Sequence, residues 1–172
     1  QAEAARVAPQ VDMNPVLLKP SGEAGSQIVL MGKAIGNRKE SSRPVDREHL
    51  FETASRACDR LRGRHGVLVL EGAGSCAEVN LLADDYINFR MAAHADAPVI
   101  LVADIDRGGV FAQVVGTLAC LPPQHQQRIK GVIINRFRGD LDLLKDGIRW
   151  IEDKTAKPVF GTLPWFDHIH IE

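Results

Sequence analysis

The stretch PVILVADIDRGGVF, residues 98–111, joins an apolar run of strand length to an acidic, glycine-rich end. The run is rich in β-branched residues and does not alternate polar with apolar side chains, which is typical of a strand covered on both faces. Further runs of this kind occupy residues 67–71, 130–135 and 158–163, and segments of helical period separate them. This order predicts parallel strands joined by crossover helices.

The segments between these runs carry helix-start signals. Ser75 and Glu78 form an S-x-x-E capping box, and Asp46 and Asp140 are N-cap candidates. A further helix is expected from about Gly109, ended by Pro122 and Pro123. The apolar stripes after the first three starts are Val79, Leu82, Ala83, Tyr86 and Ile87; Leu50, Ala54, Ala57, Cys58 and Leu61; and Leu141, Leu144, Ile148 and Ile151.

The first 45 residues have a different character. QIVLMGKAIG, residues 27–36, predicts a short hairpin between two polar, turn-rich segments, LLKPSGEAGS at 17–26 and NRKESSRP at 37–44. With the later runs, the chain predicts an α/β fold: a three-layer α/β/α domain with a mostly parallel sheet. Ligands of such sheets bind at the carboxyl ends of the strands.

Bulk composition excludes several classes of protein. The 172 residues, 45% apolar and 25% charged, predict about one ordinary globular domain. A net charge of −1 gives no global field that would favour nucleic acid or an anionic membrane. No apolar run has the length of a membrane span, and no signal peptide is evident, so we expect a cytoplasmic protein. The three cysteines show no CxxC spacing, which argues against zinc and a disulfide framework.

Glu71 closes an apolar run and precedes Gly72, Ala73 and Gly74. An acid in this position is typical of Mg²⁺ ligands in phosphate-transferring ATPases. The glycines would let the backbone approach a phosphate, and a helix starting at Ser75 would favour an anion. The alternative is a solvated acid followed by a tight turn.

Polar residues also end the next two runs. Asp104 and Asp106, followed by Arg107, could coordinate a metal, orient a substrate or simply pair with the arginine. Asn135 has the amide needed to read an adenine edge, although it could equally cap its own turn. Both interpretations stay open from the residues alone.

Two nucleotide motifs were tested against the sequence. No G-x-x-x-x-G-K-[ST] phosphate loop occurs anywhere in it. Gly72–Ala77 satisfies the G-x-G-x-x-G/A dinucleotide fingerprint, which calls for an acid about 20 positions further on. The acid at the next strand end is Asp104, 32 positions after Gly72, so a nicotinamide or flavin domain is the weaker interpretation.

Several blocks of the chain together resemble the cobyric acid synthase family. They are DMNPVLLKPS, EGAGSCAEVNL, PVILVADIDRGGVFAQVVGTL and KGVIINRFRGDLDLL, in this order. The resemblance runs from Gln1 to about Glu172. Dethiobiotin synthetase and cobyrinic acid a,c-diamide synthase share the fold, but IDRGGVF and INRFRGD favour cobyric acid synthase.

The resemblance implies a P-loop NTPase-like fold of the dethiobiotin synthetase kind, incomplete at the N-terminus. Residues 1–172 would be part of an ATP-dependent amidotransferase domain, with the phosphate loop and a C-terminal glutaminase domain outside this chain. With ATP and Mg²⁺, the family amidates peripheral carboxylates of a corrin, adenosylcobyrinic acid a,c-diamide, through acyl phosphates. The ammonia would come from the glutaminase domain, and neither nucleic acid nor membrane is expected as a partner.

The resemblance also implies residue roles. Glu71 matches the Mg²⁺-binding acid and Asn135 the purine-reading residue, with Arg136 beside it. The candidate site comprises catalytic Glu71 and Asp104; nucleotide-binding Gly72, Gly74, Asn135 and Arg136; substrate-binding Glu78, Asp85 and Asp106; and Glu71 as metal ligand. The alternatives are a corrin-binding module inactive in isolation, a related ligase such as cobyrinic acid a,c-diamide synthase, a dinucleotide-binding oxidoreductase, and a filament-regulating ATPase.

Overall fold

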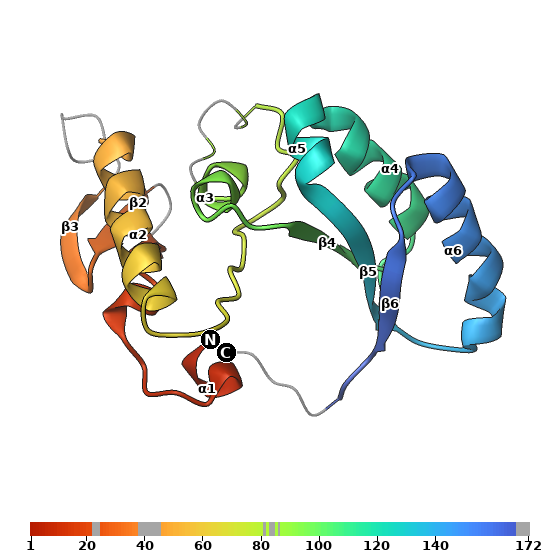
Figure 1. Cartoon of the computed structure of the whole chain (residues 1–172), viewed down its shortest axis with the longest axis horizontal. Helices are drawn as coiled ribbons and strands as arrows, with labels where there is room; N and C mark the ends of the chain where they lie inside the picture. The colour runs from red at the N-terminus through yellow and green to blue at the C-terminus, as the bar shows by residue number, and fades with distance from the viewer. Residues whose placement is uncertain (22–24, 38–45, 81, 83–84, 86, 168–172) are drawn as a thin grey trace. The chain divides into compact units, whose positions relative to one another are not determined.

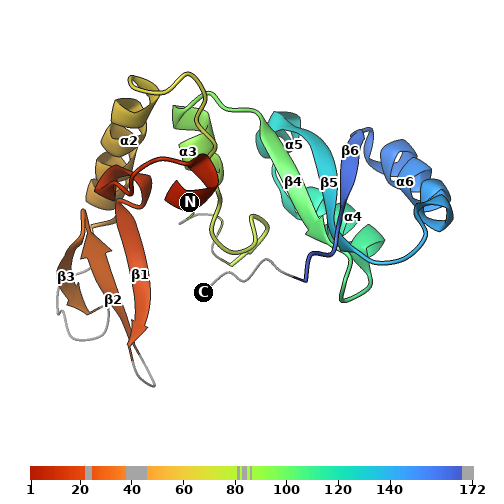
Figure 2. The ribbon, with the colours of Figure 1, turned by 90° about the horizontal axis from the view of Figure 1, so that it is seen from below.

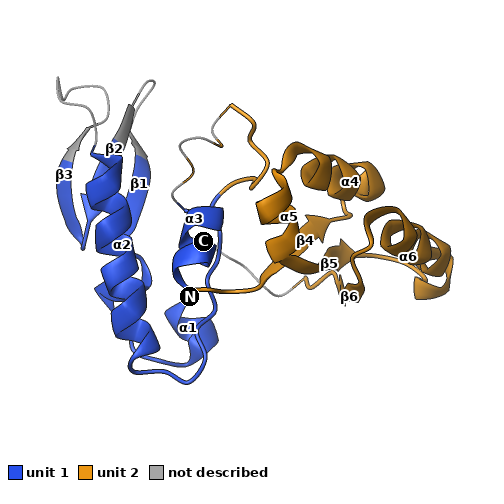
Figure 3. Cartoon of the chain, turned by 45° about the horizontal axis from the view of Figure 1, so that its top comes forward, with its two compact units in different colours: residues 1–73, 86–95 blue, residues 74–85, 96–172 orange. Residues whose placement is uncertain are grey.

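The computed structural model describes residues 1–21, 25–37, 46–80, 82, 85 and 87–167. The chain divides into two compact units, where its length alone predicts about one domain. Unit 1 comprises residues 1–73 and 86–95, and unit 2 comprises residues 74–85 and 96–172 (Figure 3). Each unit is described by itself.

Unit 1 contains an antiparallel sheet of order β1–β2–β3 (Figure 1). The predicted hairpin is confirmed, and its turn consists of Met31 and Gly32, both at positive φ. The interpretation of residues 17–26 as only turn-rich is wrong, because the apolar start of β1 pairs with β2 and extends the sheet. The elements of unit 1 are α1 (Ala2–Ala5), a 3₁₀ turn η1 (Val11–Met13), β1 (Val16–Ser21), β2 (Gly25–Leu30), β3 (Lys33–Asn37), α2 (Arg47–Arg62) and α3 (Phe89–His94).

Helix α2 confirms the predicted N-cap, because the Asp46 side chain accepts a hydrogen bond of 3.0 Å from the amide of His49. Most of the predicted stripe is buried, including Leu50 and Leu61. Arg60 on the polar side of α2 donates to both oxygens of the buried Asp12, at 3.0 and 2.6 Å. These hydrogen bonds lower the pKa of Asp12 and fasten η1 to α2.

Unit 2 contains the predicted parallel sheet, of order β4–β5–β6 (Figures 1 and 2). The α/β class and the parallel sheet flanked by helices are therefore confirmed. Three of the four predicted strands form this sheet, and β5 runs two residues beyond its predicted end at Asn135. The elements are β4 (Val99–Asp104), α4 (Val110–Cys120), α5 (Pro123–Arg128), β5 (Ile129–Phe137), α6 (Leu141–Thr155) and β6 (Val159–Pro164).

Helices α4 and α6 begin where the sequence predicts, and α4 also ends where it predicts. Helix α6 follows Asp140, whose side chain accepts from the amide of Asp142 at 2.8 Å. Helix α4 starts after Gly109, at φ 75°, and ends before Pro122. Pro123 then begins α5, at a position where its missing N–H costs no intrahelical hydrogen bond.

The core of unit 2 lies where α4 and α6 pack together and meet the sheet. Their buried side chains are Val110, Val114, Leu118, Leu144 and Ile151, and β5 contributes the fully buried Ile129, Val132 and Ile134. In β4 the burial alternates: Ala103 is buried, whereas Ile100 and Val102 are 48% and 57% exposed. The expected cover on both faces is therefore not seen in β4, where the side that carries Ala103 is the more buried one.

The predicted strand at residues 67–71 is wrong. These residues form no helix or strand, and Val67 and Val69 are 82% and 85% exposed. A strand exists only where neighbouring backbone groups pair with it, and none of the described strands pairs with this run. Apolar composition alone could not reveal the missing partner.

The predicted helix after Ser75 is also wrong for the part of it that the structure describes. The Ser75 hydroxyl accepts from the amide of Ala77, two residues on, at 3.2 Å. A capping box requires a bond to the third residue, so the serine closes a local turn instead. Val79, expected in the apolar stripe, is 65% exposed. Ala83 and Tyr86 lie outside the described residues.

Candidate functional site

The carboxyl ends of the three parallel strands bring polar groups of unit 2 together. The register places Asp104 at the end of β4 beside Asn135 of β5. The amide of Ile105 donates to the carbonyl of Asn135 at 3.1 Å, and the amide of Trp165 donates to the carbonyl of Phe137 at 2.9 Å. The segments that follow β4 and β6 are thus both fastened to β5.

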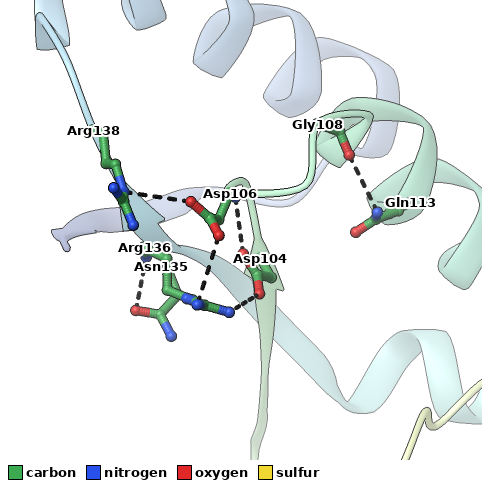
Figure 4. A network of polar contacts seen from close by, with 7 residues as sticks. All are labelled: Asp104, Asp106, Gly108, Gln113, Asn135, Arg136 and Arg138. Carbon is green, nitrogen blue, oxygen red and sulfur yellow. Dashed lines mark hydrogen bonds and ion pairs between the residues drawn. The ribbon is translucent and has the colours of Figure 1, made fainter. Parts of the chain in front are cut away.

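Arg136 departs from the regular strand geometry. Consecutive side chains of a strand point to opposite faces, so Arg136 would point away from Asp104, the partner of Asn135. Its φ of 63° breaks this alternation. The Asn135 side chain stabilises the turn by accepting from the amide of Arg136 at 2.9 Å, and the Arg136 guanidinium donates to Asp104 at 2.9 Å (Figure 4).

The Asp104 carboxylate is held on both of its oxygens. One accepts from the amide of Asp106 at 2.9 Å, and the other accepts from Arg136. The Asp106 amide and then the Arg136 guanidinium lower the pKa of Asp104. The Asp104 carboxylate is therefore ionised, and the positive charge of Arg136 balances it at the end of β4.

Asp106 makes longer contacts than Asp104 does. It lies 3.6 Å from Arg136 and 3.4 Å from Arg138, and Figure 4 shows it between the two arginines. These distances exceed the 2.7–2.9 Å of charge-assisted hydrogen bonds. Both guanidinium carbons also lie over the ring of Trp165, at 4.3 Å for Arg136 and 3.7 Å for Arg138.

A shallow depression of about 170 Å³ opens beside these groups, lined by Ile105, Asp106, Arg136, Phe137 and Arg138. Of the predicted site residues, Asp104, Asp106, Asn135 and Arg136 meet here. Arg138 and Trp165 were missed, although the charged and aromatic residues that follow the strands in NRFRG and LPW were a signal for them.

Glu71 and Gly72 belong to unit 1, whereas the Asp104 cluster belongs to unit 2. Glu71 is exposed. The Asn88 side chain fastens the next turn by accepting from the amide of Ala73 at 3.2 Å and donating to its carbonyl at 3.3 Å. A Cβ on Gly72 would collide with this side chain. A residue without a side chain is thus required at position 72 by the placement of Asn88.

The remaining predicted residues, Gly74, Glu78 and Asp85, belong to unit 2. Gly74 adopts φ 66° with open space around it, which fits a turn that approaches a ligand. Glu78 is exposed and Asp85 is half-buried.

The predicted site residues differ in how well their chemistry suits Mg²⁺ and the phosphates of ATP. The described residues hold no cluster of three or more His, Cys, Asp or Glu side chains suited to a metal. Mg²⁺ is commonly held by one or two carboxylates together with phosphates and water, and the exposed Glu71 has the chemistry for such a ligand. Asp104 already accepts one hydrogen bond on each of its oxygens, from the Asp106 amide and from Arg136. Arg136 and Arg138 suit an anionic group.

No helix in the described part of the chain is long and apolar enough to cross a membrane.

Comparisons with known proteins identify the relatives of the chain. Residues 38–171 match the family described as an AAA domain. The chain is 59% identical over 172 residues to a cobyric acid synthase of Chlorobium phaeobacteroides (strain BS1), covering 100% of this chain and 35% of that protein. It is 52% identical over 174 residues to that of Phocaeicola vulgatus (strain ATCC 8482), covering 100% and 35%. For Vibrio vulnificus (strain YJ016) the identity is 48% over 172 residues, covering 100% and 36%.

The chain spans about a third of the length of these relatives. No solved structure matches it. The resemblance to cobyric acid synthase is confirmed along all 172 residues. The chain therefore belongs to the AAA domain family, and it is similar over its whole length to cobyric acid synthases.

Proposed function

We propose that this chain contributes part of the ATP site of a ligase in cobalamin biosynthesis, of the cobyric acid synthase type. The observation that carries the proposal is the 59% identity to a named cobyric acid synthase over every residue of the chain. The AAA domain match supports nucleotide binding, and the polar cluster lies where ligands of parallel α/β sheets bind.

The proposed reaction is the amidation of peripheral carboxylates of adenosylcobyrinic acid a,c-diamide. A carboxylate is a poor acyl donor, so its oxygen first takes the γ-phosphoryl group of ATP, which yields an acyl phosphate and ADP. Ammonia then attacks the acyl carbon and phosphate leaves, with a proton lost from nitrogen. In this proposal the ammonia comes from glutamine, hydrolysed by a glutaminase domain outside the chain.

The proposed roles follow the chemistry of the side chains. The amide nitrogen of Asn135 remains able to donate to a purine, because only the oxygen of that side chain is used by Arg136. Glu71 is the proposed ligand of Mg²⁺, which supplies neutralisation of phosphate charge when bound. Gly74 lets the backbone approach the nucleotide. The acidic residues proposed to place the corrin by direct contact are Glu78, Asp85 and Asp104, and Asp106 is proposed to act on it through the neighbouring arginines.

A second candidate is a corrin-binding module that does not turn over by itself. The absence of a G-x-x-x-x-G-K-[ST] motif from the sequence favours it, since the γ-phosphate would then have no dedicated loop within this chain.

A chimera tests the proposal. This chain replaces the matching third of the Chlorobium phaeobacteroides relative, and the protein is incubated with MgATP, glutamine and adenosylcobyrinic acid a,c-diamide. Mass spectrometry of the corrin reports each exchange of a carboxyl hydroxyl for an amino group. We expect amidation by the chimera and none by the isolated chain. A folded chimera that leaves the corrin unchanged, while the intact relative amidates it, would refute the ligase assignment.

The same assay compares Arg136→Gln with Arg149→Gln. Both variants lose one positive charge from unit 2, but Arg149 lies on α6 and pairs with Asp146, three residues earlier on the same helix. Amidation should fall in the first variant and persist in the second.

A further inference from the structure

Arg138 lines the depression at the strand ends and stacks on Trp165, and neither residue has a role in the proposed reaction. We propose that Arg138, held on the ring of Trp165, binds a carboxylate or phosphate group of the substrate, and that Asp106 occupies this anion site until the ligand arrives. The proposal rests on the proposed function for the identity of the ligand, because both the corrin and ATP carry such groups.

The guanidinium of Arg138 is available for a ligand. Its nearest ionic partner is Asp106, at 3.4 Å, and none of the hydrogen bonds among the described residues has this guanidinium as donor. More than half of the side chain is exposed. The planar fork of donors that suits carboxylates and phosphates is thus left intact.

Trp165 holds the guanidinium in place. Arg138 lies 3.7 Å above the ring, well within the range of a cation–π contact. The indole is itself fixed, since its N–H donates to Asp167 at 2.6 Å and its backbone amide donates to Phe137. A stacked arginine loses less side-chain freedom on binding than a mobile one, so this arrangement is pre-organised for an anion.

Asp106 is held less tightly than Asp104, so an incoming anion can take its place beside the arginines. Asp104 receives two hydrogen bonds of 2.9 Å, whereas Asp106 lies 3.4 and 3.6 Å from its two arginines. An incoming oxyanion can approach the arginines more closely than Asp106 does. The carboxylate of Asp106 should therefore oppose anion binding by repulsion and by competition for the same donors.

The size of the depression limits what enters it. A volume of about 170 Å³ is below the roughly 300–1,000 Å³ of pockets that enclose a whole small ligand. It suits a single carboxylate or phosphate group, with the rest of the ligand extending into solvent.

The test uses the chain with Trp150→Phe, so that Trp165 is the remaining tryptophan of the two. At constant ionic strength the fluorescence of Trp165 is followed during titration with pyrophosphate and, separately, with succinate. Pyrophosphate represents the phosphates of ATP and succinate the carboxylates of the corrin. We expect a saturable response to at least one probe, and the stronger of the two identifies the source of the anion.

Substitutions of Arg138 and of Asp106 should change the Kd for the anion in opposite directions. Arg138→Gln should raise the apparent Kd about tenfold or more, because the anion loses a hydrogen bond from a charged group. Arg138→Lys keeps the charge but loses the fork, so it should also weaken binding. Asp106→Asn should lower the Kd several-fold, because it removes one repulsion near the surface. Arg149→Gln is the matched control and should not change the Kd.

The outcomes are decisive in each direction. No saturable response to either probe, unchanged binding by Arg138→Gln, or weaker binding by Asp106→Asn would overturn the proposal. Circular dichroism checks that each variant folds, and if Arg138→Gln does not, Asp106→Asn alone decides. The anion titration and the amidation assay fail independently, so loss of one is distinguishable from loss of the other.

Discussion

The guanidinium of Arg136 and the carboxylate of Asp104 lie 2.9 Å apart, across neighbouring parallel strands. The contact joins two residues that stand 32 positions apart in the chain. The Asp104 carboxylate also accepts a hydrogen bond from the backbone amide of Asp106, two residues further along the chain. The strand ends are thus cross-linked by one ion pair and one backbone hydrogen bond.

Removing the arginine should move the titration of Asp104 only part of the way back to its ordinary range. Arg136→Gln removes one cause of the lowered pKa, while the amide of Asp106, the larger cause, remains. A lowered carboxyl pKa adds stability that is present above the unfolded value, about 3.9, and is lost as the pH falls through the folded value. The variant should therefore lose less stability on acidification. Carboxyl ¹³C NMR titration measures the shift, and an unchanged Asp104 pKa would contradict the geometry.

Two helix glycines should respond oppositely to alanine. A Cβ on Gly147 of α6 would collide with the ring of Phe111 on α4, whereas nothing lies near Gly116 of α4. Gly147→Ala should destabilise the chain by about 1–3 kcal/mol through overpacking. Gly116→Ala should stabilise it by about 0.5–1 kcal/mol through helix propensity. Urea unfolding measures both, and equal effects would show that the two helices do not meet at this point.

The turn after Glu71 should loosen when Asn88 is shortened. Asn88→Ala removes the hydrogen bond accepted from the Ala73 amide and the one donated to its carbonyl. A single such bond contributes about 0.5–1.5 kcal/mol, so hydrogen exchange of the Ala73 amide should speed up by about tenfold at most. Gly72→Ala should act in the same way by displacing Asn88.

Gly66→Ala is the control for that experiment, because open space surrounds Gly66. It should leave the exchange rate of Ala73 unchanged. If the Ala73 amide exchanged equally fast in the wild type and in Asn88→Ala, the hydrogen bonds between Asn88 and Ala73 would not stabilise this turn.

Substitutions on the two faces of the unit 2 sheet should differ in their effect on the free energy of unfolding. Ile134 is fully buried, whereas Val102 is 57% exposed. Ile134→Ala should cost about 2–5 kcal/mol, as in other large-to-small core changes. Val102→Thr should stay within about 0.5 kcal/mol. Thermal and urea unfolding measure both, and a large loss in Val102→Thr would mean that this face is covered in solution.

The parts of the fold that depend on local chemistry were predictable. Asp46 and Asp140 cap their helices as expected because an N-cap acts on amides two or three residues away. The parallel strands β4, β5 and β6 were predictable because each is followed or preceded by a clear helical stripe. The meeting of Asp104 and Asn135 followed from the rule that the ends of parallel strands share one edge of the sheet.

The misses have a different origin. Residues 67–71 have the composition of a strand, but pairing depends on a neighbour that no local pattern specifies. Ser75 can bond to its second or its third following amide, and the sequence does not choose between them. The stacking of Arg138 on Trp165 depends on the register of β5 with β6 and on the left-handed turn at Arg136, and neither can be read from spacing.

The left-handed turn at Arg136 sets the preference of the backbone at the end of β5 against the ion pair with Asp104. At φ 63°, Arg136 adopts a conformation that costs a side-chain-bearing residue roughly 1–2 kcal/mol. Glycine would relax the backbone there, and it would also remove the cation that reaches Asp104. The residue that pairs with Asp104 is thus not the one best suited to the backbone, so substitutions that relax the backbone at this position should also break the ion pair.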